Sequence, residues 1–183
     1  MRKIIAAINM TLDGFCDHTA VIADDELHIH YSELLKKADT ILYGRITYQL
    51  MEYWKTLVKN PSGNKPEDEF AVTIDKISKV VFSRTLKNVN WKSARVAKQG
   101  VKEEVIDLRR QSGKNILIGS PSLIATCLNL NLIDEFQLCV HPVIAGNGLP
   151  LFKNINNRIN LRLLKTKTIG SGAVIIYYEP IKN

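Results

Sequence analysis

Residues 40–50 read TILYGRITYQL, and the fold prediction starts from the change of pattern inside this stretch. The apolar run 41–43 predicts a short buried strand that stops at Gly44, and the spacing over 47–54 predicts a helix. Arg45 stands directly between the two. A glycine lets backbone approach a ligand closely, and an arginine offers a fork of donors that matches phosphate. The alternative interpretation, a solvated arginine beside a turn glycine, remains open from this stretch alone.

Apolar runs of strand length recur along the chain and alternate with segments of helical spacing. The expected strands are 3–9, 40–43, 79–83, 94–97, 115–119, 135–142, 160–168 and 173–179. The expected helices are 25–38, 47–54, 101–111 and 121–130, and the stretch 59–69, with its prolines and glycine, is expected to be an exposed loop. This alternation predicts a single α/β domain over 1–183 with a mainly parallel sheet. Because only four residues separate the last two strands, we expect them to form an antiparallel hairpin at one edge.

Composition and charge exclude several classes of protein. No apolar run approaches the roughly 18 residues of a membrane span. The formal charge is +7, but Lys and Arg are dispersed, so we expect small anionic ligands rather than nucleic acid. The apolar run 4–8 is short and leads into Asp13-Gly14, which favours a first strand over a signal peptide. We therefore expect a cytoplasmic protein.

Neither a metal site nor a disulfide framework is expected. Cys16, Cys127 and Cys139 are odd in number and form no C-x-x-C pair. The polar cluster 24–30 contains two histidines two residues apart, which diverge on a helix. Its acidic members suit the first turn of a helix, where they complement the helix dipole.

Polar and cationic residues follow three of the expected strands. Gly44-Arg45 ends the first, Ser83-Arg84 the second, and Gly119-Ser120 the third, with Pro121 opening a helix. In an open parallel sheet, ligands bind at the carboxyl ends of the strands. The three exits together favour a phosphate-bearing nucleotide, although the chain has neither a G-x-G-x-x-G fingerprint nor a P-loop.

These exits, with further motifs, resemble the dihydrofolate reductase superfamily. The closer resemblance is to the branch that contains the reductase domain of the riboflavin-biosynthesis deaminase-reductase and its stand-alone bacterial relatives. The motifs are MTLDGF at 10–15, YGRITY at 43–48, VVFSRTL at 80–86, IGS at 118–120, LIDE at 132–135 and HPVIAGNGLPLF at 141–152. The resemblance covers nearly the whole chain. It implies a dihydrofolate-reductase-like three-layer fold, NADPH as cofactor, a small-molecule substrate and a homodimer.

The resemblance also assigns residues to the cofactor. These are Ala7, Leu12, Gly14, Gly44, Arg45, Thr47, Ser83, Arg84, Gly119, Ser120, Gly146 and Gly148. Gly44, Arg45 and Thr47 would hold the adenosine-side phosphates, and Ser83 and Arg84 would flank the ribose 2′-phosphate. Two converging arginines favour NADPH over NADH, because the additional dianion gains charge-assisted hydrogen bonds.

The substrate side carries fewer motifs. The resemblance implies substrate contacts from Asn9, Tyr31 and Pro142, catalytic roles for His28 and Asp13, and a cleft between 9–31 and 142–152. No carboxylate stands where dihydrofolate reductase has its proton donor, and His28 lies near that register.

The expected function is NADPH-dependent reduction of a small heterocycle, resembling 5-amino-6-(5-phosphoribosylamino)uracil reductase. The alternatives are a dihydrofolate or pteridine reductase, and a non-catalytic nucleotide-binding module of the same fold.

Overall fold

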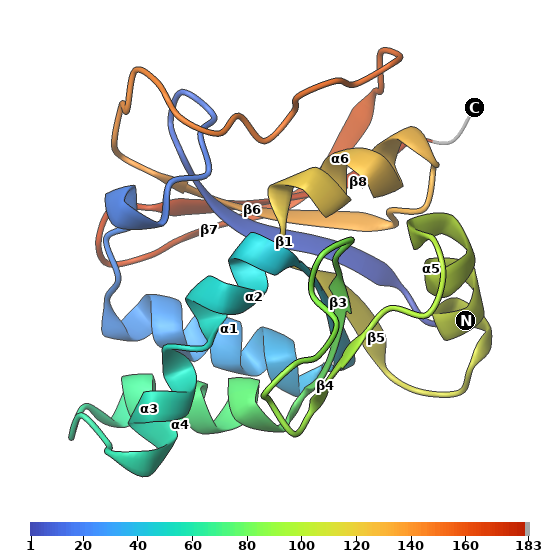
Figure 1. Cartoon of the computed structure of the whole chain (residues 1–183). Coiled ribbons are helices and arrows are strands. Elements are labelled where there is room, and N and C mark those ends of the chain that lie inside the picture. The colour runs from blue at the N-terminus through green and yellow to red at the C-terminus, as the bar shows by residue number, and fades with distance from the viewer. Residues whose placement is uncertain (182–183) are drawn as a thin grey trace.

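The computed structural model describes residues 1–181 and is built on one eight-stranded sheet (Figure 1). The strands are β1 (Ile4–Thr11), β2 (Ala38–Gly44), β3 (Ser78–Phe82), β4 (Ala94–Val96), β5 (Asn115–Ile118), β6 (Glu135–His141), β7 (Leu161–Thr168) and β8 (Val174–Pro180). Their order across the sheet is β4-β3-β2-β5-β1-β6-β8-β7. The six strands from β4 to β6 are parallel, and β8 and β7 follow antiparallel. The expected parallel sheet with an antiparallel hairpin at its edge is therefore confirmed.

Six α-helices and one 3-10 turn cover the two faces of the sheet within residues 1–181. The α-helices are α1 (Asp25–Lys36), α2 (Arg45–Met51), α3 (Trp54–Lys59), α4 (Lys65–Lys76), α5 (Val101–Arg110) and α6 (Pro121–Asn129), and the 3-10 turn η1 spans His18–Ala20. Helices α1 and α4 lie on one side and α6 on the other (Figure 1). No helix in this part of the chain has both the length and the apolar character needed to cross a membrane.

Strand β1 shows why the sheet needs both layers of helices. Ile4, Ala6 and Ile8 point into a core that includes residues of α5 and α6, whereas Ile5 and Ala7 point into a core formed with α1 and α4. A parallel strand that is buried on both faces is uniformly apolar, as the run 4–8 is.

The segment 54–76 differs from the sequence prediction. We expected an exposed loop over 59–69, but α3 ends at Lys59 and α4 begins at Lys65. The Asn64 side chain accepts a hydrogen bond from the Glu67 amide at 3.0 Å, so Asn64 is the N-cap of α4. Pro66 lies in the first turn, where the missing N–H costs nothing, so this proline begins a helix rather than marking a loop.

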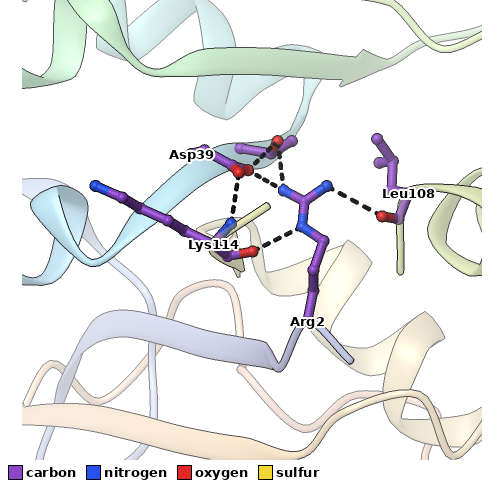
Figure 2. Close-up of polar contacts among 5 residues, drawn as sticks. Arg2, Asp39, Leu108 and Lys114 are labelled. Carbon is purple, nitrogen blue, oxygen red and sulfur yellow. Dashed lines mark hydrogen bonds and ion pairs between the residues drawn. The ribbon is translucent and has the colours of Figure 1, made fainter. Parts of the chain in front are cut away.

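Arg2 joins four segments at the amino end of the sheet, beneath the site described below (Figure 2). Its guanidinium donates to the carbonyls of Lys114 at 2.6 Å and Leu108 at 3.0 Å, and to the side chains of Asp39 and Thr40. The residue is only 6% exposed. Because a buried charge is tolerated only when paired, these contacts stabilise the register of β1, β2 and β5 at the amino end of the sheet.

Candidate functional site

The carboxyl ends of five neighbouring strands meet along one edge of the sheet. Strands β3, β2, β5, β1 and β6 are consecutive, so the exits after them are adjacent in space. Gly44 pairs with Phe82, which places Arg45 and Ser83 as the next residues on adjacent strands. The structure thus brings together the exits at Gly44, Ser83 and Gly119 that the sequence singled out.

Gly44 and Ser120 connect two of these exits. The Gly44 amide donates to Ser120 Oγ at 2.9 Å, and Ser120 is 1% exposed. The hydroxyl of Ser120 is therefore used to hold the start of α2 beside the start of α6, and it makes no cap within its own helix. A Cβ on Gly44 would lie 3.6 Å from Ser122 Oγ, at ordinary contact distance.

The cationic residues at this edge are exposed. Arg45 donates to Gln49 Oε1 at 3.1 Å, one turn along α2, and leaves most of its guanidinium in solvent. Arg84, at the end of the adjacent strand, is exposed as well. The hydroxyl of Ser83 accepts hydrogen bonds from the amides of Thr85 at 3.2 Å and Leu86 at 2.8 Å, and so shapes the turn that presents Arg84.

An apolar cavity of about 330 Å³ opens beside these exits, between the sheet and helices α1 to α4, and we call it the α1 cavity. The predicted site residues in its wall are Ala7, Asn9, His28, Tyr31, Thr47 and Gly119. Thr47 and Gly119 belong to the strand exits, and Asn9, His28 and Tyr31 belong to the opposite wall. The cavity is therefore continuous from the edge where phosphates could bind to the predicted substrate residues.

His28 presents an unsatisfied nitrogen in this wall. Its Nδ1 is buried and has no hydrogen-bond partner within residues 1–181. The ring lies 5.7 Å from the ring of Trp54 and 5.9 Å from that of Phe70, measured between centroids. A buried polar atom without a partner is costly, so Nδ1 is a group that a ligand could satisfy.

Asn9 is held by two neighbours. Its Oδ1 accepts a hydrogen bond from the Tyr31 hydroxyl at 3.0 Å and lies 3.1 Å from His141 Nε2. Nothing in the sequence shows that His141 lies beside a residue 132 positions earlier. The register of β1 against β6, in which Thr11 pairs with His141, brings the two together.

Asp13 lies between two loops and does not line the α1 cavity. Its carboxylate accepts hydrogen bonds from the Thr11 hydroxyl at 2.6 Å and from the amides of Ala145 at 3.1 Å and Gly146 at 2.7 Å. These bonds, that of Thr11 first, hold the pKa of Asp13 below its usual value. Asp13 is absent from the wall of the α1 cavity. Its catalytic role stays a prediction, and the geometry gives it the role of joining two loops.

The expected cleft between 9–31 and 142–152 stays a prediction. The amides of Leu12 and Cys16 donate to the carbonyls of Val143 and Leu149, each at 2.8 Å, so the two segments are bonded to each other over part of their length. The wall of the α1 cavity contains residues of the first segment and none of the second. Leu12, Gly14, Pro142, Gly146 and Gly148 lie outside its wall, and their ligand roles stay predictions.

Part of the cavity wall was missed by the sequence analysis. Met51, Trp54, Phe70 and Ile74 line it from α2, α3 and α4. Phe70 and Ile74 are four residues apart after the Asn64 cap, which is a helical signal that was available in the sequence. Nothing local indicated that this helix would face a cavity.

Comparison with known proteins gives the family. The sequence matches the RibD C-terminal domain family over residues 2–175, and the chain belongs to this family. It is 37% identical over 184 residues to the Bacillus subtilis uncharacterized protein YyaP, covering 97% of this chain and 95% of that protein.

Solved structures agree in fold. A putative riboflavin biosynthesis protein from Shewanella sp. PV-4 superposes with a TM-score of 0.76 at 18% identity, over 98% of this chain and 99% of that chain. Dihydrofolate reductase from Enterococcus faecalis, in a complex with NADP(H) and RAB-propyl, superposes with a TM-score of 0.64 at 11% identity, over 98% of this chain and 97% of that chain. The resemblance to the dihydrofolate reductase superfamily, in its riboflavin-reductase branch, is confirmed.

Proposed function

We propose that this protein is an NADPH-dependent reductase of a small heterocyclic compound. The observation that carries the proposal is the continuity between the strand exits and the α1 cavity through Thr47 and Gly119. An extended ligand with phosphates at the exits would have its far end in an apolar chamber beside Asn9 and His28. Membership of the RibD C-terminal domain family supports a reductase.

The donor set at the exits fits the phosphates of NADPH. The N-cap of helix α2 is Gly44, which has no side chain to cap the helix, so amides of its first turn are available to an anion. Thr47 adds a hydroxyl, and Arg45 and Arg84 add exposed guanidinium groups just beyond the adjacent strands β2 and β3. We assign Arg45 and Arg84 to the phosphates on the adenosine side.

NADPH, when bound, supplies a hydride, and the contribution of the protein is to bind, orient and exclude water. The apolar wall of the α1 cavity excludes water from the acceptor carbon. His28 Nδ1, which has no hydrogen-bond partner within residues 1–181, is placed to exchange a proton with the substrate. No carboxylate lines the cavity among the described residues, so a dihydrofolate-type mechanism with a carboxylate donor is not favoured.

An absorbance assay of NADPH oxidation against a panel of pteridines and pyrimidines tests the proposal. We expect turnover with at least one unphosphorylated ring compound, and reduced turnover with unchanged NADPH affinity in His28→Ala. Tight NADPH binding without turnover on any compound would instead identify a nucleotide-binding module.

Replacing Arg45 with Ala tests the cofactor assignment. If Arg45 makes a charge-assisted bond to the 2′-phosphate, NADPH binding weakens by roughly 1.5–3 kcal/mol, about ten- to 150-fold, while NADH binding hardly changes. Fluorescence titration of both cofactors measures this. Arg110→Ala, at the end of α5, makes the same change of charge outside the site and should leave both affinities unaltered. Equal losses for NADPH and NADH would move Arg45 from the 2′-phosphate to the pyrophosphate.

A further inference from the structure

The wall of the α1 cavity contains two histidines and no permanently charged side chain among residues 1–181. None of the Asp, Glu, Lys or Arg side chains among residues 1–181 belongs to it. Its polar groups are few, and the remainder is aliphatic or aromatic, with Trp54 and Phe70 in edge-to-face contact at 4.6 Å between centroids. A phosphate transferred into such a chamber would lose its hydration without gaining a cation. The volume of about 330 Å³ also lies at the low end of the range for ligand pockets, roughly 300–1,000 Å³.

Asn9 is the polar group whose orientation the structure determines. The Ile22 amide donates to Nδ1 of His141 at 3.4 Å, so Nδ1 is the accepting nitrogen and Nε2 carries the proton. Nε2 therefore donates to Asn9 Oδ1, which also receives the Tyr31 hydroxyl. Burial lowers the pKa of His141, in agreement with a neutral ring.

The reverse orientation of the Asn9 amide is disfavoured. It would turn the NH2 group toward His141, whose Nε2 would then have to accept. The ring proton would move to Nδ1 and face the Ile22 N–H, leaving two donors in contact. With Oδ1 occupied by two donors, the Asn9 NH2 group is left for the cavity, and no group within residues 1–181 accepts a hydrogen bond from it.

We infer that the α1 cavity takes a neutral, unphosphorylated ring compound that offers a carbonyl oxygen to the amide NH2 of Asn9. Tyr31 and His141 are positioning residues for this donor. The inference rests on the proposed function only for the statement that the bound ring is the hydride acceptor. The inference narrows the substrate class, because a phosphoribosylated pyrimidine would bring a phosphate for which the wall holds no Lys or Arg within residues 1–181.

Direct binding of two matched pairs of compounds, measured by calorimetry without NADPH, tests the inference. The first pair is 6-hydroxymethylpterin and its phosphate ester. We expect the unphosphorylated compound to bind about tenfold tighter or more, since the ester adds an unpaired charge. Equal or tighter binding of the ester, or binding of neither compound, would overturn the inference.

The second pair is pterin, which has a 4-oxo group, and 2,4-diaminopteridine, which has a 4-amino group in its place. The unaltered protein should prefer pterin, whereas Asn9→Asp, which replaces the donor with an acceptor of the same shape, should shift the affinity ratio toward the diamino compound by about tenfold. Tyr31→Phe should reduce the pterin preference by a smaller factor, because it frees the amide to rotate. Because both compounds are titrated against the same protein preparation, the affinity ratio does not depend on the fraction of the variant that is folded.

Asn157→Asp, a change of the same kind in an exposed loop, should leave the ratio unaltered. An unchanged ratio in Asn9→Asp would remove Asn9 as the specificity group. Because the cofactor titrations of Arg45→Ala do not involve the ring compounds, failure of the inference is distinguishable from failure of the proposed reductase function.

Discussion

Gly119 shows how tightly a single residue at the site is packed. A Cβ at this position would lie 3.0 Å from Cε1 of Tyr43, which is closer than side chains normally approach. Tyr43 is 2% exposed, and burial raises the pKa of its hydroxyl. The glycine that the sequence suggested for close approach to phosphate is therefore also required for packing within the sheet.

Gly119→Ala should lower the free energy of unfolding by about 1–3 kcal/mol, the usual cost of overpacking a rigid core. Denaturant unfolding measures it. Gly44→Ala is the matched control, because its Cβ would meet Ser122 Oγ at an ordinary 3.6 Å. That variant should stay within about 1 kcal/mol of the unaltered protein. Equal stability of the two variants would mean that Tyr43 can move aside.

Two loops that are remote in sequence behave as one element at the exit of β1. Phe15 forms a bridge with Pro150, the Leu151 amide donates to the Gly14 carbonyl at 3.0 Å, and the Asp13 carboxylate binds two further amides of the later loop. A Cβ on Gly148 would lie 3.3 Å from the Cβ of Phe15, so the two loops are also tightly packed at this position.

Asp13→Ala should release the later loop from the earlier one. The amides of Ala145 and Gly146 would lose their acceptors, and their hydrogen exchange should accelerate by about tenfold or more, because exchange reports local opening. Asp13→Asn, which keeps one acceptor oxygen, should give an intermediate rate. The Ile5 amide in β1 serves as the internal reference. Unchanged exchange in Asp13→Ala would show that backbone bonds alone hold the loops together.

The hairpin and α1 are held together by charged side chains. The Asp24 carboxylate caps α1 through the Leu27 amide at 2.8 Å and also accepts from the Ser171 amide at 2.7 Å, while Glu26 accepts from the Gly170 amide at 3.0 Å. The acidic cluster at the start of this helix thus fastens the β7–β8 turn, which is more than the dipole effect inferred from the sequence.

At the scale of the whole molecule, strand β8 of the antiparallel edge packs against His30 of α1. His30 is 7% exposed, and its ring contacts those of Tyr31 and Tyr177 at 5.2 and 6.4 Å between centroids. Burial, with Lys167, Lys165 and Lys37 nearby and Glu33 opposing them, lowers the pKa of His30 to about 4. Its neutral form is therefore part of the folded state.

Acid should destabilise the fold through this residue. The folded pKa lies below the unfolded value of about 6.5, so between these values the unfolded chain binds the additional proton. The contribution of neutral His30 to the free energy of unfolding is complete above pH 6.5. It is lost as the pH falls toward 4, by roughly 3 kcal/mol. Denaturant unfolding across this range should show a weaker pH dependence in His30→Gln. His18→Gln, at an exposed histidine, should keep the dependence of the unaltered protein. Identical pH profiles for His30→Gln and the unaltered protein would contradict this role.

Local patterns were sufficient for most of the sheet and for the exits. The apolar runs correspond to all eight strands within residues 1–181, and the short connection before Ala173 predicted the hairpin correctly. The exception was 59–69, where Pro66 and Gly63 suggested a loop. Capping by Asn64 and burial of Phe70 outweigh those local signals, and burial depends on partners elsewhere in the chain.

What the sequence by itself determined was the order of strands and helices and the residue types at each strand exit, because these follow from local periodicity and from the special geometry of glycine and proline. The tertiary structure alone decided which of residues 9–31 line the cavity, and that α3 and α4 complete its wall. It also decided which way the Asn9 amide faces. That orientation depends on Tyr31, on His141 and on the Ile22 amide, and a donor–acceptor arrangement among residues so far apart is set only when the sheet register brings them within hydrogen-bond distance.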